Sequence, residues 1–138
     1  MKTIFFMLAA FIFPVMLISC GKDKPGENSG SAAVPKFETI TMEEALSRMK
    51  AEKNFILLDV RHEEEFAEGH IPGAILLSNE KITPEKTGTL LKDKQQQIYV
   101  YCRSGRRSMA AAGKLSALGY EKVTNIGGIL DYKGTQEK

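Results

Sequence analysis

The chain has 138 residues, with 19 Lys and Arg against 17 Asp and Glu, which gives a formal net charge of +2. This length fits one domain with an apolar core, and the balanced charge argues against broad nucleic-acid binding. There are two cysteines, Cys20 and Cys102, far apart in the sequence.

An apolar run follows Lys2 and covers residues 4–18. About 15 residues are too few for a comfortable membrane-spanning helix and suit the core of a signal peptide. The run ends in Leu-Ile-Ser-Cys-Gly, which resembles the bacterial lipoprotein signal, in which the cysteine is acylated. We expect residues 1–19 to be a signal peptide and a lipid on Cys20 to hold the protein on a membrane. The alternative is an ordinary signal peptide that happens to contain a cysteine.

Residues 21–35 are rich in Gly, Ser, Pro and charge and have no periodic apolar face. This composition is typical of a flexible spacer. We therefore expect the lipidated cysteine and a tether at residues 20–35, followed by one folded domain at residues 36–138.

Short strands and helices alternate through the predicted domain. Apolar or alternating runs predict five strands, at residues 36–40, 55–58, 75–77, 98–101 and 122–126. Helices are predicted after Thr41, which has Glu44 in a capping-box position, after Pro84, and after Ser108 as far as Gly119. One acidic helical turn is expected at residues 62–66, with its glutamates exposed to solvent: Glu63, Glu64 and Glu65. This alternation predicts an α/β fold with a parallel sheet.

The sequence IYVYCRSGRRS, residues 98–108, places Cys102 where a strand ends and a helix is about to begin. Open α/β sheets bind their ligands at this position. Backbone N–H groups and the helix dipole favour an anion there and lower the pKa of a thiol. Gly105 allows the backbone to curl without a Cβ clash. The residues alone therefore predict a reactive thiolate surrounded by amide donors.

Several blocks resemble the rhodanese-like sulfurtransferases and occur in the order found in that family. They are LDVR at 58–61, EF at 65–66, GHIPGA at 69–74, YCRSGRRS at 101–108, LGY at 118–120 and NIGG at 125–128. The resemblance implies a central, mostly parallel five-stranded sheet with helices on both faces. It also implies that Cys102 accepts sulfane sulfur as a persulfide and passes it to a thiol or to cyanide, with no metal or organic cofactor.

The turn after Cys102 offers groups for a small anionic sulfur donor such as thiosulfate or polysulfide. Arginine presents a planar fork to oxyanions, and turn amides stabilise a persulfide anion. We expect the donor to be bound by residues 103–107: Arg103, Ser104, Gly105, Arg106 and Arg107. Asp59 and Arg61, at the end of the second predicted strand, are expected to be structural residues that pair near the site.

Three other functions can be weighed from the same residues. Cysteine-loop phosphatases and arsenate reductases need an arginine six positions after the cysteine, where this chain has Ser108. A thiol–disulfide oxidoreductase needs a second cysteine two or three residues away, and Cys102 has none. A membrane-tethered sulfur carrier or interaction module without its own turnover would use the same thiolate, so it stays open. The expected location is the bacterial cell envelope, on the extracytoplasmic or periplasmic side, with the oligomeric state open.

Overall fold

The computed structural model describes Val34 and residues 36–138. The predicted signal peptide, Cys20 and the tether other than Val34 lie outside the described residues. Within these residues, strands and helices alternate as predicted: β1 (Glu38–Thr39), α1 (Met42–Ala51), β2 (Phe55–Asp59), α2 (Glu63–Glu68), β3 (Ile75–Leu76), α3 (Pro84–Leu90), β4 (Gln97–Cys102), α4 (Arg106–Ala117) and β5 (Val123–Gly128). Short 3₁₀ turns occupy Asn79–Lys81 and Ile129–Asp131.

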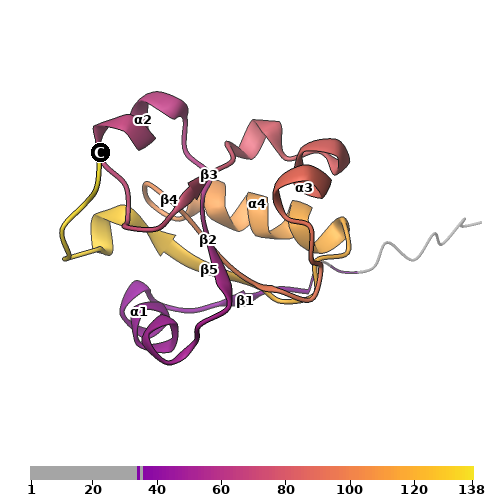
Figure 1. Cartoon of the computed structure of the whole chain (residues 1–138), viewed down its shortest axis with the longest axis horizontal. Coiled ribbons are helices and arrows are strands. Elements are labelled where there is room, and N and C mark those ends of the chain that lie inside the picture. Colours follow the sequence, from indigo (N-terminus) through magenta and orange to yellow (C-terminus); the bar gives the residue numbers. More distant parts are fainter. Residues whose placement is uncertain (1–33, 35) are drawn as a thin grey trace, which may run out of the picture. The chain divides into compact units, whose positions relative to one another are not determined.

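The strands form one five-stranded sheet in the order β1-β5-β4-β2-β3, and every strand pairing in it is parallel. This confirms the predicted α/β fold. Helix α1 packs on one face of the sheet, and α4 with the end of α3 packs on the other (Figure 1). Because parallel strands end at the same edge, the last residues of the three inner strands, Asp59, Cys102 and Gly128, meet there.

The central strand β4 shows why the sheet is covered on both faces. Successive side chains point to opposite faces of a strand. Accordingly Ile98, Val100 and Cys102 belong to the core cluster beneath α4, whereas Tyr99 and Tyr101 belong to the cluster beneath α1. Full burial of an apolar side chain of this size stabilises the fold by about 1.5–3 kcal/mol. The unbroken apolar run at residues 98–101 therefore corresponds to a strand that is buried on both faces.

The start of α1 corrects one detail of the predicted capping box. Thr41 Oγ1 accepts a hydrogen bond from the Glu44 N–H at 3.2 Å, as expected of an N-cap. The Glu44 carboxylate, however, binds Arg48 at 2.7 Å. The i,i+4 ion pair along the helix takes the place of the reciprocal half of the box.

The two ends of the described chain are fastened at different places. Lys36 N–H donates to Ser116 Oγ at 2.8 Å, and Ser116 Oγ donates to the Lys36 carbonyl at 3.0 Å. The chain therefore joins the domain at the last turns of α4. At the other end, His70 and Glu137 exchange two backbone hydrogen bonds of 2.9 Å in an antiparallel bridge, which places the C-terminus beside α2 (Figure 1).

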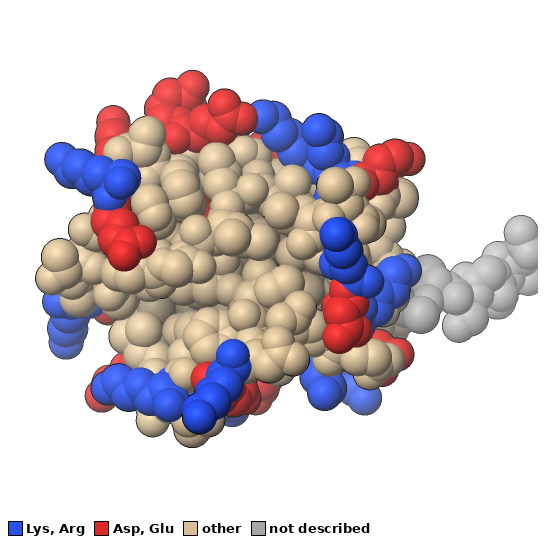
Figure 2. Space-filling view, viewed as in Figure 1, with Lys and Arg blue, Asp and Glu red and all other residues tan. Residues whose placement is uncertain are grey.

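On the face seen in Figure 2, Lys and Arg side chains are interspersed with Asp and Glu around a mostly uncharged centre. This face presents no broad field of a single sign. Within the described part of the chain, no helix is both long enough and apolar enough to span a bilayer.

Candidate active site

Cys102 is the last residue of β4, and only 1% of its surface is exposed. The strand's alternation turns its side chain toward α4, beneath the first turn of that helix. Gly105 closes the connection between strand and helix as the N-cap of α4, with a φ of 100° that glycine adopts without strain. The connection between strand and helix, residues 103–105, thus folds back over the sulfur.

Polar groups of the turn and of the first residues of α4 surround the Cys102 sulfur. The Gly105 N–H donates to Sγ at 3.1 Å, and Ser108 Oγ lies 3.6 Å from Sγ. Burial raises the pKa of the Cys102 thiol, but hydrogen bonding with the Ser108 hydroxyl and with three backbone N–H groups lowers it by more. The three N–H groups belong to Ser104, Gly105 and Ser108. The pKa of Cys102 therefore lies below its ordinary value, which favours the nucleophilic thiolate.

The glycine pair at the end of β5 supports the turn from below. A Cβ on Gly128 would lie 2.2 Å from the Arg103 carbonyl oxygen, so only glycine allows this close approach. The Arg103 carbonyl also accepts the Leu130 N–H at 3.3 Å. The Ser108 hydroxyl lies 2.9 and 3.2 Å from the Gly105 and Gly127 carbonyl oxygens and donates its single proton to one of them at a time. These contacts hold the active-site turn, here residues 102–105, against β5.

The three arginines that follow Cys102 have different surroundings. Arg103 and Arg106 are exposed, and in the described part of the chain neither forms an ion pair. Arg107 is half-buried and makes a two-pronged ion pair with Glu65, with Nη1–Oε2 and Nη2–Oε1 distances of 2.6 and 2.8 Å. The structure thus leaves two of the three arginines open to solvent and pairs the third with α2.

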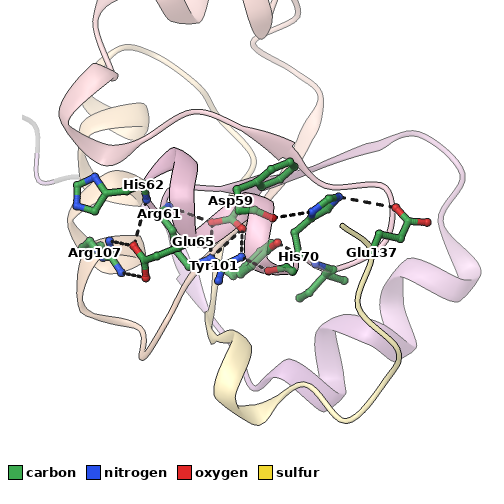
Figure 3. A network of polar contacts seen from close by, with 11 residues as sticks. Asp59, Arg61, His62, Glu65, His70, Tyr101, Arg107 and Glu137 are labelled. Carbon is green, nitrogen blue, oxygen red and sulfur yellow. Dashed lines mark hydrogen bonds and ion pairs between the residues drawn. The ribbon is translucent and has the colours of Figure 1, made fainter.

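Asp59 and Arg61 form a buried ion pair at the end of β2. Arg61 Nη2 lies 2.7 Å from Asp59 Oδ2 and donates to the Gly69 carbonyl at 2.7 Å. The Tyr101 hydroxyl accepts the Ile71 N–H at 3.1 Å, and burial followed by the charge of Asp59 raises the pKa of that tyrosine. The pair therefore fastens the segment after α2 to the sheet edge beside the site (Figure 3).

Two residues near the site were not predicted from the sequence. Ser108 was considered only as the position where a phosphatase carries arginine, yet its hydroxyl is fully buried against the Cys102 sulfur. Side chains in a first helical turn point back toward the helix N-terminus, a signal that could have identified it. The expectation of solvated glutamates holds for Glu63 and Glu64 but is wrong for Glu65, whose side chain is 25% exposed because it pairs with Arg107.

Other candidate sites can be located among the described residues. A cavity of about 610 Å³ lies between the start of α1 and the end of β5; its lining includes Gly127 and Leu130 but not Cys102. Within residues 36–138 no group of three or more His, Cys, Asp or Glu side chains is placed to hold a metal ion. Cys102 is a free cysteine in the described part of the chain.

Comparison with known proteins places this geometry in a family. A sequence model described as the rhodanese-like domain matches residues 41–135. The thiosulfate sulfurtransferase PspE of Escherichia coli is 38% identical over 74 residues, covering 54% of this chain and 70% of PspE. The Bacillus subtilis protein YrkF, named as a candidate sulfur carrier, is 33% identical over 115 residues, covering 83% of this chain but only 60% of YrkF.

A solved structure described as a rhodanese with anions from E. coli superposes with a TM-score of 0.56 at 35% sequence identity. The superposition covers 60% of this chain and 96% of the E. coli chain. Of the elements in the described residues, the segment matched by the sequence model includes all four α-helices, four of the five strands and the Cys102 turn. The chain therefore belongs to the rhodanese-like domain family.

Proposed function

We propose that this protein moves sulfane sulfur from a small anionic donor, such as thiosulfate or polysulfide, to a thiol or cyanide acceptor through a persulfide on Cys102. The chain is a rhodanese-type sulfurtransferase, and its relative PspE is named a thiosulfate sulfurtransferase. The observation that carries the proposal is the buried Cys102 sulfur, which is surrounded by the hydroxyl of Ser108 and the N–H groups of its own turn.

The chemistry consists of two displacements at sulfur. The Cys102 thiolate attacks the outer sulfur of thiosulfate, the S–S bond of the donor breaks, and sulfite leaves with the bonding electron pair. The enzyme then carries the persulfide Cys–S–S⁻. Cyanide or a thiolate then attacks the outer persulfide sulfur and the S–S bond of the persulfide breaks. The products are thiocyanate or an acceptor persulfide, and the Cys102 thiolate is regenerated. No net oxidant or reductant is consumed.

The residues around the sulfur have separate tasks in this scheme. The turn N–H groups stabilise negative charge on sulfur before and after transfer. Arg103 and Arg106 attract the anionic donor, since both are exposed beside the turn. The E. coli structure that superposes on this chain is described as a rhodanese with anions, which supports an anionic ligand for the proposed site.

Replacing Cys102 with serine tests the proposal directly. The intact protein should form thiocyanate from thiosulfate and cyanide, and Cys102→Ser should abolish this activity because the hydroxyl is a far weaker nucleophile. Mass spectrometry should find one added sulfur on Cys102 after donor treatment. An intact thiol after thiosulfate, polysulfide and persulfide donors alike would reject the sulfurtransferase function.

A sulfur-carrier role is the second candidate, supported by the name of YrkF. A carrier would gain sulfur on Cys102 but release it only to a specific partner. Persulfide formation without turnover on cyanide or small thiols would favour that role over an independent enzyme.

The domain boundaries and the membrane attachment are also part of the proposal. Residues 1–19 act as the signal peptide, Cys20 carries the lipid, and residues 20–35 link it to the domain at 36–138, in the bacterial cell envelope. The support is the Leu-Ile-Ser-Cys-Gly sequence after an apolar run. Cells fed labelled palmitate should label the protein, and Cys20→Ala should remove the label. Label that persists in Cys20→Ala would reject the anchor.

A further inference from the structure

We propose that Glu65 and Arg107 form a positioning pair that sets the first turn of α4, and that Arg107 is not a ligand of the sulfur donor. The inference rests on the proposed sulfurtransferase function and assigns separate roles to arginines that the sequence does not distinguish. It is carried by the contacts of the pair, by the support of Glu65 within α2, and by the link from Arg107 to the sulfur.

The Glu65 carboxylate occupies the hydrogen-bonding fork of the Arg107 guanidinium. Both terminal nitrogens of the guanidinium donate to the two carboxylate oxygens of Glu65, at 2.6 and 2.8 Å (Figure 3). A two-pronged arginine–carboxylate contact of this kind fixes direction as well as distance. The side chains are only 22% and 25% exposed, so water screens the contact less than it would at an open surface. A donor oxyanion would have to displace Glu65 to use this fork.

Glu65 is itself held in place by α2. Its Oε2 accepts the N–H of His62, the N-cap of that helix, at 3.2 Å. The next residue, Phe66, stacks on the His70 ring with centroids 3.7 Å apart and planes 7° apart. The hydrogen bond from Arg107 is the main cause that lowers the pKa of Glu65, to about 2. The carboxylate therefore remains charged throughout the working pH range.

Arg107 transmits this restraint to the reacting sulfur. It is the second residue of α4, and the next residue is Ser108, whose hydroxyl lies 3.6 Å from Cys102 Sγ. The Ser108 backbone N–H also lowers the pKa of Cys102. The pair thus joins α2 to the helical turn that supplies two donors to the thiolate, although the two partners lie 42 residues apart in the sequence.

The experiment is a double-mutant cycle in the full chain with Glu65→Gln, Arg107→Gln and the double variant. Each single variant should lower kcat about tenfold and leave KM for thiosulfate within about twofold, because the turn is misplaced while the donor ligands remain. The double variant should lose no more than the singles. Iodoacetamide alkylation, read by mass spectrometry of the Cys102 peptide, should move to higher pH in all three variants.

Two variants separate this role from a general structural one. Arg107→Lys keeps the charge but loses the fork, so it should resemble Arg107→Gln and serves if the glutamine variant does not fold. Arg48→Gln is the control: it removes a two-pronged pair with Glu38, at 2.7 and 3.0 Å, and the ion pair with Glu44, all within β1 and α1 and outside the active-site turn. That control should leave kcat and the alkylation profile unchanged.

A several-fold rise in KM in Arg107→Gln, together with a fall in KM in Glu65→Gln, would overturn the inference and make Arg107 a donor ligand. Unchanged kcat and alkylation in both single variants would also overturn it. Alkylation does not require a sulfur donor, so the positioning role can be tested even if the protein fails to turn over thiosulfate.

Discussion

At the scale of single residues, the lowered pKa of Cys102 comes from fixed hydrogen-bonding groups and not from contact with water. Only 1% of its surface is exposed, and burial alone would raise the pKa of the thiol. The Ser108 hydroxyl and the turn N–H groups reverse that effect. In the proposed mechanism, groups that are already oriented would need no rearrangement as charge moves between the two sulfurs of a Cys102 persulfide.

Replacing Ser108 with alanine tests whether the Ser108 hydroxyl lowers the pKa of Cys102. Loss of the hydroxyl removes a hydrogen bond that lowers the pKa of Cys102, so the pKa should rise and less thiolate should be present at neutral pH. The alkylation profile should move to higher pH, with a rate at pH 7 about tenfold lower. Ser104→Ala is the control, because Ser104 contributes through its backbone N–H. Equal profiles for wild type and Ser108→Ala would contradict the assignment.

At the scale of secondary structure, the site depends on how closely β5 approaches the active-site turn. Cys102 pairs with Gly128 after a register shift that begins at Val100. The shift brings the glycine backbone directly under Arg103. The turn therefore packs directly on the end of β5, and residue 128 must lack a side chain for the turn to fit.

A methyl group at Gly128 should disturb that packing. Gly128→Ala would place a Cβ 2.2 Å from a backbone oxygen, which has to move. The change should lower the free energy of unfolding by about 1–3 kcal/mol and reduce thiocyanate formation. In Gly88→Ala, within α3, the new Cβ meets nothing within 4 Å, so stability should rise by up to about 1 kcal/mol. Unaltered activity in Gly128→Ala would show that the turn tolerates the shift.

At the scale of the whole molecule, the last residues of the chain brace the elements around the site. Glu137 bonds to the backbone of His70, and its carboxylate lies 3.8 Å from His70 Nε2. His70 Nδ1 lies 3.0 Å from the Phe66 carbonyl of α2 (Figure 3). The C-terminal segment is thus connected through α2 to Glu65 and the active-site turn.

Removal of residues 135–138 should loosen this brace. Two backbone hydrogen bonds of 2.9 Å are lost, which should cost about 1–2 kcal/mol. For a domain of this size Tm should fall by several degrees, as measured by circular dichroism. Removal of Lys138 alone keeps Glu137 and should leave Tm unchanged. Equal Tm values for both truncations would show that the bridge contributes nothing.

The sequence predicted those features that depend on neighbours along the chain. Apolar runs located β2 and β4, and the residues after β4 placed Cys102 at a strand end before a helix. Contacts between distant segments were not predictable from spacing. The Glu65–Arg107 pair joins residues 42 apart, and an acidic helical turn is ordinarily solvated. The need for glycine at position 128 follows from the path of another segment, which periodicity does not encode.

The fastening of Lys36 to Ser116 has a consequence for where anything attached before residue 36 joins the domain. The chain joins the domain at the last turns of α4, whereas the active-site turn precedes the first, so the two lie at opposite ends of a 12-residue helix. Such a helix is about 18 Å long. Under the proposed lipid attachment, the tether would enter the domain at the end of α4 that lies away from the thiolate. An affinity tag placed before Lys36 would join the domain at the same remote end, away from the active-site turn.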